Sequence, residues 1–293
     1  MSLKYSGEFE LPQFILAMTS LDDKIYILLE HLHVVSIHKD IAPFACQSRI
    51  VFPPPELKAS SRLHVASYPS FMVACDETKC IYIANSTDIH IWRLTTPDNK
   101  LKVWLSDISD SFSAYVARNG HVVLLRLGDV SQAGMPHLME IYNKDAILMH
   151  EIAFPSMRLE PCWGLEISPG KLAFLIHQTL LIQGVNFRTL IADPDVIVFP
   201  NAHRRWINTC IVDITSYCEG QILGLLWKRL ALFDSQLNVN IIPTSNLIDA
   251  EKTSLYFKKD KRQLMIWSYD MNTSVIQIYT LAYEAEDMFA GNP

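Results

Sequence analysis

Short apolar segments separated by polar turns recur along the whole chain, and helical periodicity is nearly absent. The clearest stretch is 71–105, where FMVAC, CIYIA, IHIWRL and LKVWL are separated by the polar segments DETK, NSTD and TTPDNK. Four strands joined by three hairpin connections predict a four-stranded antiparallel sheet, which is one blade of a β-propeller.

The second strand of this pattern appears six times. Its copies are residues 24–29, 80–85, 121–126, 171–176, 221–226 and 263–268. The anchor positions are Ile25, Ile81, Val122, Leu172, Ile222 and Leu264, spaced by 56, 41, 50, 50 and 42 residues. This spacing is typical of propeller blades, which repeat every ~40 to 50 residues. The chain is therefore predicted to be an all-β, six-bladed β-propeller.

The ends of the repeats indicate how the ring closes. Three predicted outer strands end in Phe-Pro, at 52–53, 154–155 and 199–200, and proline is suited to an outer edge because it cannot donate to a sheet ladder. The sixth blade lacks a fourth strand of its own, so the N-terminal segment 5–12 is expected to supply it. Residues 1–283 then form one domain, and the acidic segment 284–293 a loose tail. A large β-sandwich is the alternative, but it predicts neither the repeat nor the Phe-Pro ends.

Composition and charge narrow the class of protein. Hydrophobic residues make up 49% of the chain and charged residues 19%, which is enough to build a large core. The formal net charge of −6 opposes broad electrostatic capture of nucleic acid or anionic lipid. The N-terminus has no secretory pattern, and the longest apolar stretch, 172–185, is interrupted by polar residues. A soluble, cytoplasmic protein is the expectation.

Two segments carry a resemblance to a known family. The run CDETKCIYIANSTDIHIWRL at 75–94 resembles the NHL-repeat type of six-bladed propeller, in which an apolar strand and a turn rich in Asp and Asn precede a second apolar strand. The run EPCWGLEISPGKLAFLIH at 160–177 is similar to uncharacterised invertebrate NHL-like proteins. The resemblance implies a binding role, toward proteins or, as in tripartite-motif relatives, toward structured RNA.

A minority of six-bladed propellers are enzymes, including calcium-dependent lactonases and an amidating lyase. A calcium-dependent hydrolase would need several oxygen ligands from the innermost strands. The predicted inner strands offer only two carboxylates, Glu166 and Asp213. No Gly-x-Ser-x-Gly, HExxH or phosphate-binding glycine loop is found. We therefore expect no catalytic residue, no metal and no cofactor.

Cysteine usage is too low for a disulfide scaffold, at six residues. Five of the six sit beside apolar neighbours, which predicts small buried residues. Cys75 and Cys80 flank the four-residue turn DETK, so they are expected to lie opposite each other across a hairpin. They could form a disulfide in an oxidising compartment and would stay reduced in the cytosol.

The candidate binding site is a rim of blades four and five. In a propeller, the connections from outer to inner strands share one rim with the loops between second and third strands. Aromatic and basic residues predicted to lie there are Trp163, His177, His203, Arg204, Arg205, Trp206, Trp227, Lys228 and Arg229. Such residues favour interface hot spots, although the tryptophans could equally pack between blades. They could also stack on unpaired bases.

The sequence thus favours a non-enzymatic interaction module that binds a protein or peptide through this rim. RNA binding through the same rim is the first alternative, and a calcium-dependent hydrolase is the disfavoured second.

Overall fold

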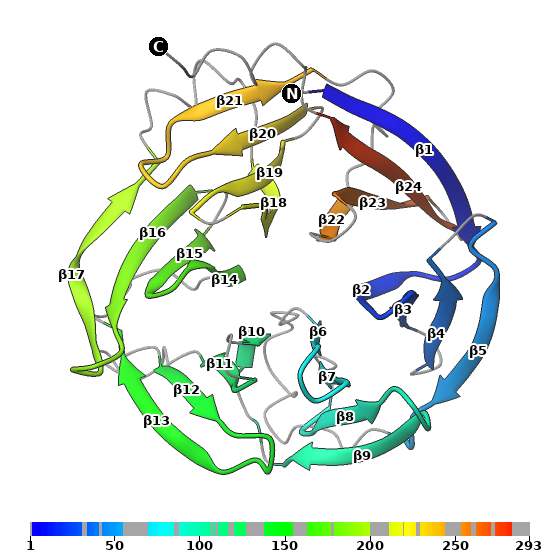
Figure 1. Cartoon of the computed structure of the whole chain (residues 1–293), viewed down its shortest axis with the longest axis horizontal. Helices are drawn as coiled ribbons and strands as arrows, with labels where there is room; N and C mark the ends of the chain where they lie inside the picture. Colours follow the sequence, from blue (N-terminus) through cyan, green and yellow to red (C-terminus); the bar gives the residue numbers. More distant parts are fainter. Residues whose placement is uncertain are drawn as a thin grey trace, which may run out of the picture.

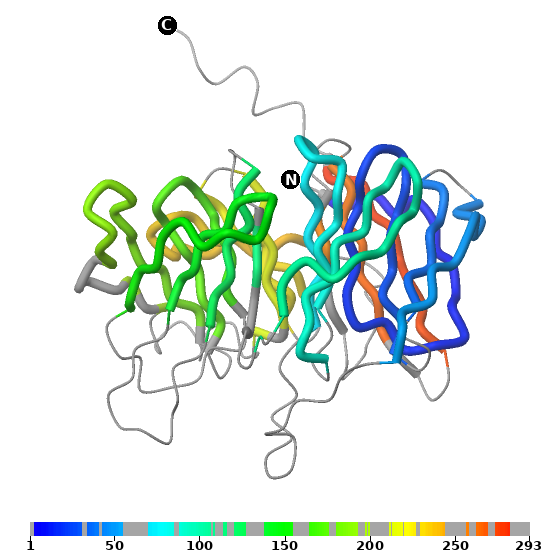
Figure 2. The backbone as a smooth tube through the Cα atoms, turned by 90° about the horizontal axis from the view of Figure 1, so that it is seen from below, coloured from blue at the N-terminus to red at the C-terminus, as the bar shows by residue number. Residues whose placement is uncertain are grey.

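The computed structural model confirms the predicted architecture: the described residues form 24 strands in six four-stranded antiparallel sheets arranged around a ring (Figure 1). The structure describes residues 2–30, 34–40, 43–54, 70–84, 88–106, 108, 111–116, 120–126, 138–154, 163–176, 179–199, 211–218, 220–226, 229–243, 253–258, 262–270 and 273–282. Seen from the side, the blades form a short ring whose strands run between two rims (Figure 2).

The first five blades each use four consecutive strands, ordered from the centre outward. Blade 1 contains β2 (Ile15–Leu21), β3 (Lys24–Leu29), β4 (Val34–Lys39) and β5 (Cys46–Val51). Blade 2 contains β6 (Phe71–Cys75), β7 (Cys80–Ala84), β8 (Ile91–Thr95) and β9 (Lys100–Leu105). Blade 3 contains β10 (Ser111–Val116), β11 (Val122–Arg126), β12 (Leu138–Tyr142) and β13 (Leu148–Ala153).

Blade 4 contains β14 (Trp163–Ser168), β15 (Lys171–Ile176), β16 (Thr179–Asn186) and β17 (Ile191–Val198). Blade 5 contains β18 (Ile211–Ser216), β19 (Ile222–Leu226), β20 (Arg229–Phe233) and β21 (Val239–Ile242). Blade 6 contains β22 (Thr253–Lys258), β23 (Gln263–Asp270) and β24 (Thr273–Ala282). Its fourth, outer strand is the N-terminal β1 (Ser2–Leu11).

The predicted closure by the N-terminal segment is confirmed. β1 pairs with β24 from Ser2 opposite Ala282 to Leu11 opposite Ser274, with a bulge between Tyr5 and Gly7. The strand that begins the chain therefore completes the last sheet. This pairing joins the two ends of the ring, so that blade 6 has the same four-strand width as the other blades.

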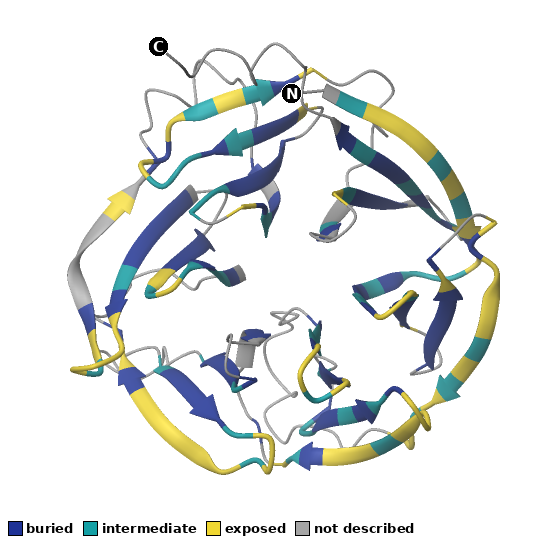
Figure 3. Cartoon of the chain, viewed as in Figure 1, coloured by how far each residue is buried: buried dark blue, intermediate teal, exposed yellow. Residues whose placement is uncertain are grey.

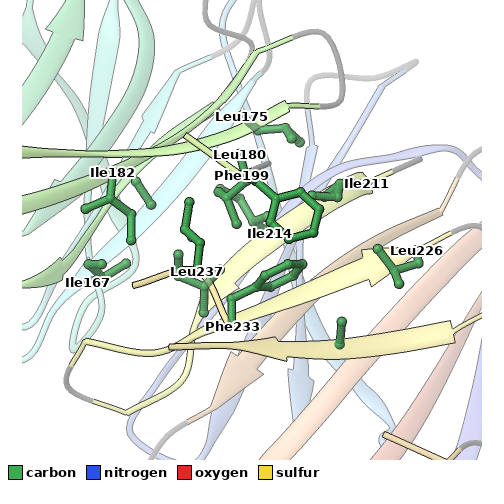
Figure 4. Packing of buried hydrophobic residues seen from close by; sticks show 13 residues of the cluster. Ile167, Leu175, Leu180, Ile182, Phe199, Ile211, Ile214, Leu226, Phe233 and Leu237 are labelled. Atoms are coloured by element: carbon green, nitrogen blue, oxygen red, sulfur yellow. The ribbon is translucent and has the colours of Figure 1, made fainter. Parts of the chain in front are cut away.

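The core lies between neighbouring blades. Figure 4 shows the cluster between blades 4 and 5, where the ring of Phe199 meets the ring of Phe233 edge-on, with centroids 5.3 Å apart. Apolar residues on alternate positions of each strand face the next blade, which explains why the sequence reads as short alternating strands. Burial falls from the middle strands to the outer ones: most of β5 and β13 and half of β9 are exposed (Figure 3).

One glycine is required by close packing between blades 3 and 4. A Cβ at Gly164 in β14 would lie 2.6 Å from Leu125 Cδ1 and 3.0 Å from Phe174 Cδ1. Leu125 comes from blade 3, so the absence of a side chain at Gly164 lets blade 3 approach the inner strand of blade 4.

Candidate functional site

The predicted rim residues are only partly within the described chain. Trp163 is the first residue of β14, and Arg229 is exposed as the first residue of β20. The strands β15, β17 and β19 all run toward this rim, as their antiparallel order requires. Among the predicted residues, His177, His203, Arg204, Arg205, Trp206, Trp227 and Lys228 lie outside the described residues. Their assembly into one surface stays a prediction.

The inner strands present the two carboxylates that the sequence singled out. Glu166 lies in β14, and its charge adds to burial in raising the pKa of Tyr115 above its usual range. Asp213 lies buried in β18, and its Oδ1 accepts a hydrogen bond from the Ile214 amide at 2.8 Å. Across the described residues, no group of three or more His, Cys, Asp or Glu side chains could hold a metal ion.

The cysteines differ in part from the expectation. Cys75 and Cys80 are buried and directly opposite each other in the β6–β7 register, as predicted, and both thiols are free. Cys80 Sγ donates to the Thr78 carbonyl at 3.2 Å. Cys46 and Cys218 are exposed, so the prediction of five buried cysteines is wrong. Cys46 lies on the outer strand β5, whose residues are all exposed or half-buried, so an apolar neighbour in sequence does not place it in the core.

The turn in the NHL-like segment is held by one carboxylate. Asp88 is buried, and its Oδ1 accepts from the amide of His90 at 3.1 Å and contacts its Nδ1 at 3.0 Å. Its Oδ2 accepts from Trp92 Nε1 at 2.8 Å. These bonds fix the entry into β8. The Asp88 carboxylate therefore forms its hydrogen bonds within the blade.

A basic pocket that the sequence analysis missed lies on blade 2. It measures about 160 Å³ and is lined by Arg93, Thr95, Asp98, Lys100 and Lys102. The β8–β9 register places Arg93 opposite Lys102 and Thr95 opposite Lys100, so all four project from one face of the sheet. In the structure the turn between β8 and β9 spans residues 96–99, and the pairing follows from this register, which the polar segment TTPDNK alone does not reveal.

The one carboxylate that lines the basic pocket already interacts with residues of its own hairpin. Asp98 accepts from the Thr95 hydroxyl at 2.6 Å and lies 3.0 Å from Lys100 Nζ. The bonds from Thr95 and Lys100 lower the pKa of Asp98 to about 2, so this carboxylate stays ionised. By contrast, Arg93 and Lys102 pair with no carboxylate in the part of the chain that the structure describes.

The basic pocket is fixed to the neighbouring blade. Arg93 Nη1 donates to the Lys144 carbonyl oxygen at 3.0 Å, and Trp104 Nε1 donates to the same oxygen at 3.0 Å. The Trp104 ring also packs edge-on against Tyr82 of its own blade and Tyr142 of blade 3, with centroids 4.7 Å and 5.8 Å away. This side of the pocket therefore belongs to the boundary between blades 2 and 3.

Exposed apolar side chains gather on the outer strands of blades 3 and 4. Among the described residues, nine large apolar side chains are exposed, and six of them belong to the third-to-fourth strand hairpins and outer strands of blades 3 and 4. We call these six the apolar wall: Ile147, Leu148, Met149, Phe187, Ile191 and Ile197. β13 and β17 contact each other, so the two halves of the wall are on neighbouring outer strands (Figures 1 and 3).

Comparison with known proteins supports the fold. No family model and no curated protein matches the sequence. The structure is similar to virginiamycin B lyase from Staphylococcus aureus, with a TM-score of 0.58 and 12% identity over 96% of this chain and 100% of that one. It is also similar to the calcium-binding protein regucalcin from Agrobacterium tumefaciens, with a TM-score of 0.60 and 11% identity over 94% of this chain and 96% of that one.

A third similar structure is the AfRom2 CNH domain, with a TM-score of 0.54 and 8% identity over 97% of this chain and 100% of that one. At these identities the likeness establishes the six-bladed propeller fold and does not transfer an activity. No helix in the described part of the chain is long and apolar enough to cross a membrane.

Proposed function

We propose that this chain is a non-enzymatic interaction module whose rigid ring presents the apolar wall of blades 3 and 4 to a protein partner. The observation that carries the proposal is the concentration of exposed apolar side chains on two neighbouring outer strands. Exposed apolar side chains that cluster on a folded protein often mark an interaction site, because leaving them in water is unfavourable. Ile147, Leu148 and Met149 are consecutive at the start of β13 and form the main cluster, whereas Ile191 and Ile197 lie on the face of β17 that is turned toward blade 5. The resemblance of 75–94 and 160–177 to NHL-type propellers supports a binding role as well.

The partner that fits this surface is an extended protein segment. β13 is the outermost strand of blade 3, so one of its edges is open to pairing. Two other outer strands carry residues that protect edges: β9 contains Lys100 and Lys102, and β17 contains Pro194. β13 has the sequence LMHEIA, with neither lysine nor proline, and beyond its bulge at Met149 it pairs regularly with β12. An extended segment could add to this edge and place apolar side chains against Leu148 and Met149.

Charge complementarity defines the partner further. The basic pocket adjoins the turn that leads into β13, since Arg93 bonds to Lys144. Leu148 pairs directly with Tyr142, whose ring meets Trp104 of blade 2, so Leu148 projects from the face of blade 3 that meets the pocket's blade. A segment that combines apolar residues with a negative charge would match both features.

The experiment compares matched variants of the outer strands. Leu148→Asp and Met149→Asp place a charge on the apolar wall at positions that are 46% and 45% exposed. Val51→Asp is the control, since Val51 is 68% exposed on the outer strand of blade 1. We expect wild type and Val51→Asp to retain the partner and both wall variants to lose it. The comparison holds when all four proteins unfold at the same urea concentration. Equal retention by all four would refute the apolar wall.

The predicted rim of blades 4 and 5 remains a second proposed contact surface for the same function. Arg229 is exposed there. The double variant Arg205→Glu, Trp206→Ala tests it separately, because it leaves β13 unchanged. Loss of the same partner from this variant would assign the contact to the rim.

A further inference from the structure

We propose that the basic pocket on blade 2 receives a phosphorylated side chain of the protein segment that lies on the apolar wall. This inference rests on the proposed function, since it assigns a chemical feature to the same partner. The basic pocket and the apolar wall are different sets of side chains, however, so this inference and the proposed function can fail separately.

Charge matching favours a phosphoryl group. Three cations and one carboxylate line the pocket: Arg93, Lys100, Lys102 and Asp98. Their formal charges leave a local excess of two positive charges, on a chain whose overall charge is −6. A phosphorylated serine, threonine or tyrosine carries about −1.5 to −2 at neutral pH, whereas a carboxylate carries only one negative charge. The phosphoryl group therefore balances the pocket best.

The donors of Arg93 are incompletely used. A guanidinium has five N–H donors in a planar fork, a geometry suited to oxyanions. Arg93 Nη1 donates to the Lys144 carbonyl, which holds the side chain in place, and Nε is buried with no partner. Lys102, directly opposite in the register, is exposed and has no carboxylate partner among the described residues. Because Nε is buried, an oxyanion between Arg93 and Lys102 would contact the remaining Nη donors of Arg93 and the Lys102 ammonium group.

Size and place favour a side-chain group over a free ligand. The pocket volume of about 160 Å³ is small beside the ~300–1,000 Å³ of pockets that enclose a whole small molecule. It is large enough for a single charged group whose remaining contacts lie outside it. Those contacts are available on the adjoining wall, beginning at Ile147 and Leu148. The acidic balance of the chain opposes docking on an anionic membrane surface, which a lipid phosphate would require.

The test uses a minimal probe. N-acetyl-phosphoserine amide is titrated into the full ¹⁵N-labelled chain at constant ionic strength, with N-acetyl-serine amide as the matched control and inorganic phosphate as a second probe. We expect saturable shifts of the Thr95, Lys100 and Lys102 amides with both phosphorylated probes and none with the serine probe. Lys102→Gln should weaken binding by about fivefold to tenfold, because it removes one charge-assisted contact. Lys171→Gln, an exposed lysine on blade 4, should leave the affinity unchanged.

Three outcomes would overturn the inference. The first is the absence of saturable shifts, and the second is equal weakening by Lys102→Gln and Lys171→Gln. The third is binding to vesicles containing phosphorylated phosphatidylinositol that Lys102→Gln abolishes, without binding of phosphoserine, which would assign the pocket to a lipid headgroup. If the partner is lost with Leu148→Asp and fully retained with Lys102→Gln, the pocket inference fails while the proposed function stands. If phosphoserine binds but Leu148→Asp retains the partner, the proposed function fails instead.

Discussion

Arg93 of blade 2 donates a hydrogen bond to the main-chain carbonyl oxygen of Lys144 in blade 3, over 3.0 Å. The same oxygen accepts from Trp104 Nε1, so one carbonyl group receives two side chains from the neighbouring blade. Because Arg93 also lines the basic pocket, the position of its guanidinium depends on how blades 2 and 3 pack together. The pocket is therefore a property of the ring and not of one hairpin.

Trp104→Phe tests this boundary. Phenylalanine keeps an aromatic ring between Tyr82 and Tyr142 but removes the donor to Lys144. We expect a loss of about 1–2 kcal/mol in the free energy of unfolding, from the lost hydrogen bond and the smaller ring. Urea denaturation measures it. Lys102→Gln is the control, since Lys102 is exposed and should change stability by less than about 0.5 kcal/mol. A Trp104→Phe variant as stable as this control would contradict the proposed anchoring.

Breaking the buried ion pair of blade 3 should lower the free energy of unfolding far more than breaking the exposed pair between blades 1 and 2. Arg126 Nη1 lies 2.5 Å from Glu140 Oε1, and Glu140 is buried and also accepts from the Tyr142 hydroxyl at 2.8 Å. Arg126→Leu leaves this carboxylate without its cation, and we expect the free energy of unfolding to fall by about 2–3 kcal/mol. This is at the low end for a buried pair, because Arg126 is partly exposed.

The matched comparison is Lys79→Ala, which breaks the exposed pair with Asp22 and should cost less than about 1 kcal/mol. The double variant Arg126→Leu, Glu140→Leu should recover part of the loss, because the uncompensated charge is then gone. A double variant less stable than Arg126→Leu alone would show that the stability comes from the ion pair itself and not from neutralising the Glu140 carboxylate.

His38 should make the fold sensitive to mild acid. It is buried, with Nδ1 2.9 Å from the Phe44 carbonyl and Nε2 2.7 Å from Ser36 Oγ, an arrangement that suits the neutral ring. Burial lowers the pKa of His38 below its usual 6.5, and the charge of Arg49 acts in the same direction. As the pH falls, His38 is therefore protonated in the unfolded chain before it is protonated in the folded one. The stabilisation by neutral His38 is complete above pH 6.5 and is lost as the pH falls below it.

Urea midpoints measured between pH 7.5 and pH 5 test this dependence. We expect wild type to lose more stability over that interval than His38→Gln, which cannot titrate at this position. Other acidic and basic groups contribute equally to both proteins. Identical slopes for the two proteins would contradict the assignment to His38.

The cysteines should separate into two reactivity classes. Cys46 and Cys218 are exposed, whereas Cys75 and Cys80 are buried, and burial raises the pKa of the Cys80 thiol. Because the thiolate is the reactive form, iodoacetamide at pH 8 should label Cys46 and Cys218 quickly, and Cys75 and Cys80 only after unfolding. Peptide mass spectrometry after purification under reducing conditions reads out all four sites. Rapid labelling of Cys80 in the native protein, or a Cys75–Cys80 disulfide under these conditions, would contradict the structure.

The repeat of alternating strands was readable from the sequence because each blade buries both faces of its middle strands. The second strand of blade 1 was predicted at 24–29 and is found as β3 with those bounds. Closure by the N-terminus was also predictable, since the sixth repeat lacked an outer strand and β1 carries the matching alternation. Phe-Pro marked the ends of outer strands because proline stops a ladder, as β13 shows by ending at Ala153.

The surface could be predicted less well, because exposed positions are not constrained by packing. The predicted site consists of aromatic and basic residues in loops, whereas the basic pocket is built on a hairpin and was not predicted. Arg93 and Lys102 are nine positions apart, and their convergence follows only from the cross-strand register. The exposure of Leu148 and Met149 was hidden for a related reason, since an apolar residue on an outer strand looks in sequence like part of a core.

The proposed function requires the partner to contact the apolar wall on the outer strands of blades 3 and 4. Site-specific photo-crosslinking tests it most directly, with p-benzoylphenylalanine placed at Leu148 or, as the matched control, at Val51. We expect a discrete crosslinked species from position 148 that is absent from position 51 and is reduced when Lys102→Gln is added. Crosslinking of equal yield at both positions, or at position 51 alone, would contradict it.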